Sequence, residues 1–358
     1  MQLPPPVHGA SMMNKQIQDS KAINATFNCH FINLTTAKDV NDIGKGSFLK
    51  VFTMIRIWWQ VVKTFRKEKF DLVYLTLSPH GLAFYKDGIL AILLKLFGAK
   101  LVYHLHGKGI KERYNSGIFN KWLYKLVFKK AKVIHLAPSL YADIQDFVDK
   151  KNVWFVPNGI KENHDNLKVT KNEDSILYLS NMQESKGSLV LLQAAKILKE
   201  RNISCKIDFV GKWHNDDSFR QQWTAFYNSN NLQEVVTYHG PKYGIDKEQF
   251  FSTAGIFVLP TFYKNECFPI AILEAMSYGL PVVTTNEGAI ADIIKNGETG
   301  FVVTKKDASE LASSLEALLT NTELRKRLGQ NSKEEFNLKY TSNIFEKNLI
   351  AALNEINA

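Results

Sequence analysis

The sequence predicts an α/β protein made of two doubly wound, Rossmann-like domains whose sheets face a central cleft. Short apolar segments alternate with amphipathic segments of helical length, which is typical of parallel sheets covered by helices. The alternation stops in the polar stretch 161–174 and then restarts. A length of 358 residues is enough for two such domains, each with its own core. Sheets of this kind bind ligands at the carboxyl ends of their strands, so we expect the site there.

The first predicted domain spans residues 1–157. It opens with a proline-rich loop that ends at Gly9 and continues into a helical stretch over 10–27. Strands are predicted where apolar runs are bounded by polar or turn residues, at 29–34, 71–77, 100–105, 132–136 and 153–156. Helices are predicted where the apolar residues recur with helical spacing, at 47–69, 82–97, 116–130 and 139–149.

The second predicted domain spans residues 158–338. Its strands are predicted at 175–180, 205–210, 235–239, 256–259, 281–285 and 300–303. Its helices are predicted at 188–201, 246–252, 269–278, 289–294, 308–320 and 323–336. The remaining segment, 339–358, is predicted to hold a C-terminal helix over 342–357 that packs back toward the first domain.

The composition is that of a soluble globular protein, with 45% hydrophobic and 22% charged residues. The apolar run Gly88–Leu94 is far shorter than the ~20 residues that cross a bilayer. No signal-peptide pattern opens the sequence. Three scattered cysteines without metal-ligand spacing fit a reducing compartment, so we expect a cytoplasmic protein without a metal site.

The net charge of +10 is concentrated in the first domain, where sixteen lysines and arginines face four carboxylates between residues 56 and 132. Segment 120–132 interleaves tryptophan, leucine, valine and phenylalanine with lysines, as in helices that lie on an anionic membrane surface. A helix packed on a sheet with its lysines in solvent explains the pattern equally well. No nucleic-acid-binding motif is present, so we expect no nucleic-acid partner.

The stretch 265–274 predicts an anion-binding helix end flanked by carboxylates. The residue before a proline avoids the helical region, so Phe268 and Glu266 should lie on a loop that precedes a helix starting at Pro269. Glu274 then lies in that short helix, which Gly279 closes. Free amides at a helix start bind anions, and carboxylates accept hydrogen bonds from hydroxyl groups. This combination suits a sugar joined to a phosphate.

Loop 181–187 is a second candidate for binding phosphate, because it also follows a predicted strand and precedes a helix. Lys186 offers a compact positive charge, Gly187 allows close backbone approach, and Ser188 is a suitable N-cap. A lysine before a glycine is weak support taken alone. Together with the glutamate loop, it supplies charge balance for a diphosphate.

These motifs resemble glycosyltransferase family 4, also called glycosyl transferases group 1, whose members have the GT-B fold. The stretch from Glu266 to Glu274 matches the family's two glutamates separated by seven residues, and the following A-M-x-x-G-x-P-V-V is intact. Residues 180–187 match the family's loop with a basic pair, and 288–292 with 297–301 match its glycine-containing turns. The resemblance covers essentially the whole chain and is most specific over 175–303.

The resemblance implies a retaining transferase that moves a sugar from a nucleotide diphosphate, UDP or GDP, to a hydroxyl of a glycan or lipid-linked acceptor. No metal and no other cofactor would be essential. Residues 1–157 would bind the acceptor and 158–338 the nucleotide sugar. The setting would be surface polysaccharide or lipopolysaccharide assembly, in the cytoplasm or peripherally on the inner face of the membrane.

Roles follow by position in the motif. Glu266 would hydrogen-bond the hydroxyls of the donor sugar, Glu274 the ribose, and Lys186 would neutralise the departing diphosphate. The resemblance also implies a histidine at a strand end of the first domain, where His106 and His104 both fit. The predicted catalytic residues are Glu266, His106 and Lys186. The predicted donor-binding residues are Gly9, Asn181, Lys186, Phe268, Ile270, Ala271 and Glu274.

Two departures from the family pattern keep alternatives open. The family usually has arginine where this chain has Asn181, whose uncharged amide stabilises a leaving diphosphate less. The family also begins with a buried strand before the proline-rich loop, so we expect further residues before Met1. The alternatives are a catalytically weak nucleotide-sugar-binding subunit of a partner transferase, or a nucleotide-sugar epimerase or phosphorylase-type enzyme of the same fold.

Overall fold

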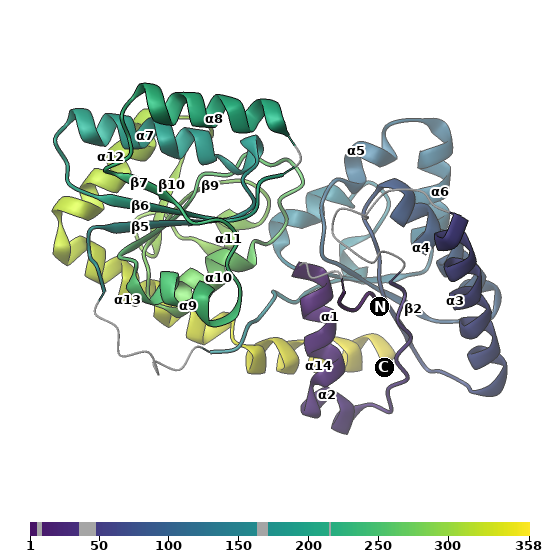
Figure 1. Cartoon of the computed structure of the whole chain (residues 1–358). Coiled ribbons are helices and arrows are strands. Elements are labelled where there is room, and N and C mark those ends of the chain that lie inside the picture. Colours follow the sequence, from purple (N-terminus) through teal and green to yellow (C-terminus); the bar gives the residue numbers. More distant parts are fainter. Residues whose placement is uncertain (6–8, 36–47, 163–170, 215) are drawn as a thin grey trace. The chain divides into compact units, whose positions relative to one another are not determined.

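A computed structural model describes residues 1–5, 9–35, 48–162, 171–214 and 216–358. The chain forms two compact units, and each contains one parallel sheet covered by helices (Figure 1). The first unit comprises Met1–Asn158 together with Asn343–Ala358, and the second comprises Gly159–Ser342. The chain therefore returns to its first unit at the end, through the helix α14 (Ser342–Asn357).

The sheet of the first unit has four parallel strands in the order of the sequence, β1-β2-β3-β4. Their bounds are β1 (Val73–Thr76), β2 (Leu101–Leu105), β3 (Lys132–His135) and β4 (Val153–Phe155). All five residues of β2 are buried, as expected for a strand with neighbours on both sides and a helical layer over it. The carboxyl ends of β2 and β3 carry histidines, which are described with the site below.

The α-helices of the first unit, besides α14, are α1 (Gly9–Asp19), α2 (Lys21–Thr26), α3 (Phe48–Lys67), α4 (Gly81–Leu96), α5 (Ile110–Tyr114) and α6 (Ile118–Phe128). The helix predicted over 10–27 is broken in two because the Ser20 hydroxyl accepts from the amide of Ile23 and caps α2. The helix predicted over 139–149 is only a 3₁₀ segment, Pro138–Asp143, followed by turns.

The strand predicted over 29–34 is wrong, because this segment is extended chain outside the sheet. Its contacts to the first residues of the chain are too few for a ladder. The Met1 ammonium donates to Ile32 O at 3.1 Å, and Leu34 N donates to Met1 O at 2.9 Å. Most of its side chains are only half-buried or exposed, so the apolar pattern did not correspond to a strand buried on both faces.

The sheet of the second unit has six parallel strands in the order β10-β9-β8-β5-β6-β7. Their bounds are β5 (Ser175–Leu179), β6 (Lys206–Val210), β7 (Val236–Tyr238), β8 (Ile256–Leu259), β9 (Val282–Thr285) and β10 (Gly300–Val303). The order reverses between β5 and β8, which are direct neighbours. This reversal is the switch point of a doubly wound sheet, and ligands bind just beyond the strand ends there. The loops that follow β5 and β8 are the two predicted from the sequence.

The α-helices of the second unit are α7 (Ser188–Glu200), α8 (Asp217–Ser229), α9 (Gly244–Thr253), α10 (Ile270–Ser277), α11 (Ile290–Ile293), α12 (Ala308–Thr320) and α13 (Thr322–Lys339). The prediction missed α8. Its start carries a recognisable signal, because the Asp216 carboxylate accepts from the amide of Phe219. Among the described helices of both units, none is long and apolar enough to cross a membrane.

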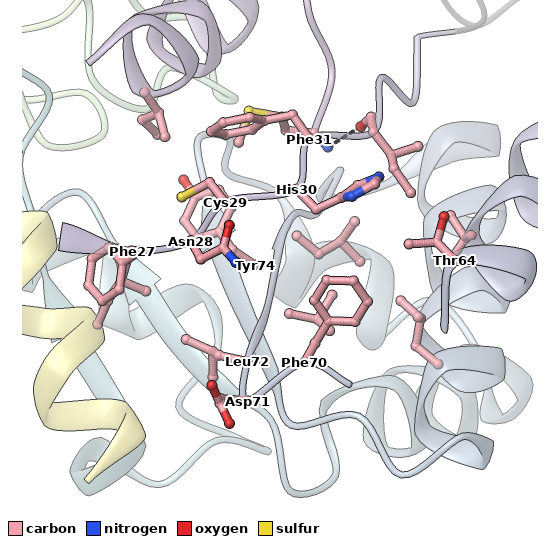
Figure 2. Close-up of a pocket in the computed structure, with 18 of the residues that line it drawn as sticks. Phe27, Asn28, Cys29, His30, Phe31, Thr64, Phe70, Asp71, Leu72 and Tyr74 are labelled. Carbon is pink, nitrogen blue, oxygen red and sulfur yellow. Dashed lines mark hydrogen bonds between the residues drawn. The ribbon is translucent and has the colours of Figure 1, made fainter. Parts of the chain in front are cut away.

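A cavity of about 360 Å³ lies in the first unit, away from the predicted site residues. Figure 2 shows its walls: the extended segment from Phe27 to Phe31, Thr64 of α3, and the chain from Phe70 into β1. Leu349 and Leu353 of α14 close another side. The lining is mostly apolar, and its charged side chains Lys69 and Asp71 have opposite signs, which does not suit a phosphate ligand.

Candidate functional site

The loop between β8 and α10 carries the first group of predicted residues. Pro269 has an extended backbone and is the N-cap, so the helix begins at Ile270, one residue later than predicted. The amide of Ile272 donates to Pro269 O at 3.1 Å, which is the first hydrogen bond of the helix. The amides of Ile270 and Ala271 lie ahead of this bond and point out of the helix start, where an anion binds.

Glu266 and Lys186 meet in this site although they are 80 residues apart in sequence. Lys186 Nζ donates to Glu266 Oε2 at 2.6 Å, and the Glu266 side chain is only 9% exposed. Thr261 Oγ1 contacts the same carboxylate oxygen at 3.3 Å, and Lys186 Nζ lies 4.7 Å from the centre of the Tyr263 ring. The site thus holds a cation and a carboxylate side by side in a largely desolvated position, where electrostatic interactions are strong.

Two glycines permit this approach of the loops. Gly187 has φ +79°, and a Cβ there would lie 2.1 Å from Pro260 O. Gly288 has φ +61°, and a Cβ there would lie 2.2 Å from Glu266 O. Any larger residue at either position would push away the backbone that carries Glu266. Gly187 also caps α7, so Ser188 is the first helical residue and not the predicted N-cap.

Glu274 lies in α10 and is paired with a lysine that the prediction did not include. Lys247 Nζ of α9 donates to Glu274 Oε1 at 2.5 Å. Burial raises the pKa of Glu274, and the positive charge of Lys247 opposes that shift. Lys247 therefore helps to keep the carboxylate ionised and fixes one of its oxygens.

A second pair missed by the prediction lies beside the glutamate loop. Lys305 Nζ donates to Glu287 Oε2 at 2.7 Å, and Glu287 is buried. Glu287 precedes Gly288, whose neighbour Ala289 donates from its amide to Cys267 O at 2.9 Å. This pair anchors the turn that packs on the Glu266 loop. No local pattern in the sequence indicates which lysine pairs with which glutamate.

Asn181 opens the loop after β5, and its side chain is exposed. Its carbonyl accepts from the amide of Gln183 at 2.9 Å and from the Tyr178 hydroxyl at 3.3 Å. Gly211 allows the neighbouring strand to approach here, because a Cβ at that position would lie 1.8 Å from Ser180 O. Asn181 thus starts the loop that ends at Lys186, and it adds no charge to it.

His106 and Gly9 lie in the first unit. Gly9 is exposed at the start of α1. His106 follows β2 and is half-buried, and its ring centre lies 4.1 Å from that of His104. His104 is fully buried, and its Nδ1 is hydrogen-bonded to the Tyr74 hydroxyl. Of the two candidate histidines, His106 is therefore the less buried, although both nitrogens of its ring are also shielded from solvent.

The buried histidines of the first unit are held neutral. Burial, followed by the proximity of His106 and then His135, lowers the pKa of His104 well below its ordinary value. Burial and the proximity of His106 lower the pKa of His135 to about 3. His135 Nδ1 accepts from the amide of Leu136 at 2.9 Å, which fixes its tautomer. These imidazoles stabilise the strand ends and do not carry charge near neutral pH.

Asp143 orders the loop that follows His106, and the prediction did not include it. Its Oδ2 accepts from the amides of Gly109 and Ile110, and its Oδ1 accepts from the amide of Lys111, all at 2.9 Å. The carboxylate thus satisfies the free amides at the start of α5. Asp143 lies in a 3₁₀ segment 33 residues further along the chain than Ile110, so only the fold brings them together.

The fold defines a Rossmann-like protein, and Lys186, Glu266 and the start of α10 form a candidate site at the switch point of its second sheet. Residues 159–335, nearly the whole second unit, match the model of the family described as glycosyl transferases group 1. Residues 159–335 belong to this family, as the sequence predicted, and the chain has the GT-B fold.

Individual relatives agree with this assignment. The chain is 28% identical over 177 residues to the capsular polysaccharide biosynthesis glycosyltransferase CapM of Staphylococcus aureus, covering 49% of this chain and 45% of that protein. It is 30% identical over 178 residues to the D-inositol 3-phosphate glycosyltransferase of Paenarthrobacter aurescens strain TC1, covering 49% of this chain and 43% of that protein. The chain thus matches somewhat less than half the length of these relatives.

Solved structures show the same fold over the whole chain. The structure of Alr3699/HepE of Anabaena in complex with UDP-glucose has a TM-score of 0.73, with 18% identity, covering 99% of this chain and 98% of that one. Sucrose-phosphate synthase of Thermosynechococcus elongatus has a TM-score of 0.74, with 18% identity, covering 98% and 94%.

Proposed function

We propose that this protein is a retaining glycosyltransferase that moves a sugar from a UDP- or GDP-sugar to a hydroxyl of a glycan or lipid-linked acceptor. The observation that carries the proposal is the Lys186–Glu266 pair beside the start of α10, at the switch point of the second sheet. A cation and free amides suit a diphosphate, and an adjacent carboxylate suits sugar hydroxyls. The name of CapM supports a role in surface polysaccharide assembly.

In this reaction the bond from the anomeric carbon to the diphosphate breaks, and negative charge builds on the diphosphate as it leaves. Lys186 and the amides of Ile270 and Ala271 would stabilise that charge, which lowers the barrier only if they interact more strongly in the transition state. Glu266 would hold the donor sugar through its hydroxyls. Because Lys186 and these amides can stabilise the negative charge on the diphosphate, we propose transfer without an essential metal or other cofactor.

Two further residues have proposed roles, Glu274 in the second unit and His106 in the first. Glu274 would accept hydrogen bonds from the ribose with the carboxylate that Lys247 keeps ionised. His106, the more exposed of the two strand-end histidines, would act near the donor sugar. Gly9 and Phe268 would contribute backbone contacts to the donor. Asn181 would offer an uncharged amide where the family usually has an arginine.

The test is turnover of a panel of UDP- and GDP-sugars by the purified chain, followed as release of the nucleoside diphosphate. Glu266→Gln is expected to lower the rate by about 10² to 10³, the cost of removing one stabilising group from such a site. Glu184→Gln changes an exposed carboxylate in the neighbouring loop and is expected to leave the rate unchanged. Unchanged turnover by Glu266→Gln would contradict the proposed site.

A second candidate function is a nucleotide-sugar-binding subunit that supports a partner transferase. It is favoured by one observation, the exposed and uncharged Asn181 where the family usually has arginine. Tight donor binding in a thermal-shift titration without turnover of any donor would support it. In that case Asn181→Arg is the informative variant, since it restores a cation to the loop.

A further inference from the structure

The helices α3, α4 and α6 form one layer on the sheet of the first unit, with α4 in contact with both of the others (Figure 1). Each buries one side in the same core, through residues such as Ile57 of α3, Leu94 of α4 and Val127 of α6. The opposite sides of the three helices therefore face away from the sheet, where polar residues are expected.

These outward sides are instead strongly apolar. Of the fifteen large apolar side chains that are exposed in the described residues, ten lie on these helices or on Phe97 at the end of α4. Besides Phe97, these ten are Phe52, Ile55 and Trp59 of α3, Leu82, Ile89 and Leu96 of α4, and Ile118, Phe119 and Trp122 of α6. Soluble proteins rarely expose so many neighbouring apolar groups without a partner.

The spacing shows that each helix contributes a continuous stripe. Leu82, Ile89 and Leu96 recur every seven residues, or about two turns, so they align along one side of α4. Phe52, Ile55 and Trp59 are spaced by three and four residues, which also places them on one side of α3. Ile118 and Trp122 have the same relation on α6. We refer to the ten residues together as the apolar face.

Positive charges outnumber carboxylates around the apolar face, where Glu68, directly after α3, is an exposed carboxylate. Exposed lysines and arginines on or directly after the helices are Arg56, Lys63, Arg66, Lys67, Lys121, Lys125, Lys129 and Lys130. Lys63 Nζ lies 5.0 Å from the centre of the Trp59 ring. The only acidic residue in the sequences of the three helices is Asp87, and it is buried. The pattern of exposed aromatic and aliphatic groups among lysines is typical of surfaces that lie on anionic membranes.

The layer is preformed, because Lys95 joins α4 to the end of α6. Its Nζ donates to the carbonyls of Leu126, Val127 and Lys129, at 3.0, 2.5 and 2.7 Å. Burial and the proximity of Lys129 lower the pKa of Lys95 to about 8. Lys95 thus contributes to the packing of the layer, and the lysines of the outward side are the ones available to a partner.

We propose that the apolar face binds the surface of an anionic phospholipid bilayer, with its tryptophans and leucines among the headgroups and its lysines on lipid phosphates. Charge decides between the possible occupants. A second copy of the chain would bring the same positive charges to the contact, whereas an anionic bilayer supplies both negative charge and an apolar interior. The proposal goes beyond the transfer reaction and holds whether or not the chain transfers a sugar.

The experiment is sedimentation of the full chain with vesicles of phosphatidylcholine alone or mixed with phosphatidylglycerol. We expect binding to the anionic vesicles that weakens with salt. The double variant Trp59→Asp/Trp122→Asp is expected to lose about tenfold or more in affinity, because two exposed aromatic anchors are replaced by repelled charges.

A matched pair of single variants controls for the added charge. Leu96→Asp changes an exposed leucine of the apolar face, and Leu338→Asp changes a similarly exposed leucine of α13 in the second unit. Only Leu96→Asp is expected to weaken vesicle binding. Both residues are largely exposed, so unchanged melting temperatures are expected and verify that the variants fold.

Three results would overturn the proposal: no binding to anionic vesicles, equal binding by Trp59→Asp/Trp122→Asp, or a self-association of the chain that these substitutions abolish while vesicles have no effect. Release of nucleoside diphosphate with a water-soluble acceptor is measured in parallel. A variant that loses vesicle binding but keeps this turnover shows that transfer does not require the apolar face. Glu266→Gln is expected to keep vesicle binding while its turnover falls, which shows that the two proposals are independent.

Discussion

The two units share the same architecture but place their charged groups differently. In the second unit, lysines and carboxylates meet as ion pairs, between two loops for Lys186 and Glu266 and between α9 and α10 for Lys247 and Glu274. In the first unit, the strand ends carry buried neutral histidines, and the positive charges lie on the outer surface of the helices. Two sheets of the same kind can therefore carry buried ion pairs in one unit and an exposed apolar and basic surface in the other.

Close backbone contacts order the loops of the second unit, whereas a side chain orders the loop after His106 in the first unit. Gly187, Gly211 and Gly288 each lie where a Cβ would meet a backbone oxygen at 2.2 Å or less. In the first unit, the loop after His106 is held by a side chain, Asp143, and by ordinary hydrogen bonds. Substitutions in the two units should separate these two ways of ordering a loop.

Replacing Lys186 tests the ionic site most directly. Lys186→Met removes the cation proposed for the diphosphate and leaves the buried Glu266 without its partner, so the rate of transfer is expected to fall by about 10² to 10³. Lys196→Met, on an exposed side of α7, is the control and is expected to keep the rate. The measurement is the initial rate at saturating donor. A variant that retains more than about a tenth of the rate would contradict the role of Lys186.

Two glycines with the same backbone conformation test the close contacts. Gly187→Ala places a Cβ against Pro260 O, and it is expected to lower the free energy of unfolding of the second unit by about 3 kcal/mol or more. Gly297 has φ +78°, close to the +79° of Gly187, but has open space around its Cβ position. Gly297→Ala is expected to cost only about 1 kcal/mol, the cost of the left-handed conformation. Equal losses in urea unfolding would show that the contact has no effect.

The neutral histidines of the first unit should make its stability depend on pH. Their pKa is lowered in the folded state, so only the unfolded chain binds protons as the pH falls below about 6.5. For His135 this loss of stability extends from there to about pH 3, at about 1.4 kcal/mol per pH unit. His104 acts in the same direction.

Calorimetry at pH 7, 6 and 5 measures this effect for the two units. The transition of the first unit is expected to move to lower temperature as the pH falls. The described histidines of the second unit, His214 and His239, are not buried, so its transition is expected to move less. His135→Gln should remove one protonation from the slope for the first unit. An unchanged slope would mean that His135 is already protonated in the folded state.

Lys247 is expected to have the smallest effect, because it acts through Glu274. Lys247→Met removes the charge that opposes the raised pKa of Glu274, so that pKa rises further and the carboxylate is protonated at higher pH. The KM for the donor is expected to rise about three- to tenfold near neutral pH, and the acid limb of kcat/KM should shift to higher pH. A pH profile of donor turnover checks this.

Gln249→Met, at an exposed position two residues further along α9, is the control for Lys247→Met. It should leave both the KM and the pH profile unchanged. A rise in KM without a shift of the acid limb would indicate that Lys247 supports the packing of α9 and does not act through the charge of Glu274.

The fold could be predicted where apolar runs are continuous and bounded by turn residues. The predicted strands of the second unit correspond to β5 to β10 within one or two residues. The prediction failed where a side chain acts on the backbone, as Ser20 does in ending α1 and starting α2. It also failed at 29–34, an apolar segment that is extended chain and pairs with none of the strands in the described residues.

The candidate site could be predicted only in part. Glu266, Glu274 and the helix start between them belong to one short stretch. Their spacing therefore already indicates that one glutamate precedes the helix and the other lies within it. Lys247, Thr261 and Asp143 could not be predicted, because each acts on a partner brought close by the fold and no local pattern surrounds it. The choice between His104 and His106 also required burial, which alternation along a strand does not distinguish for residues on the same side.

The alternation of strands and helices, the family, and the two glutamates on either side of a helix start could be predicted from the sequence, because each depends on residues within a few turns of each other. Three features depend on the tertiary structure: the sheet order that brings the loops after β5 and β8 together, the partner of each carboxylate, and which sides of α3, α4 and α6 are exposed within the described residues. These features depend on contacts between distant segments, and such contacts form only when the sheets and their helical layers pack.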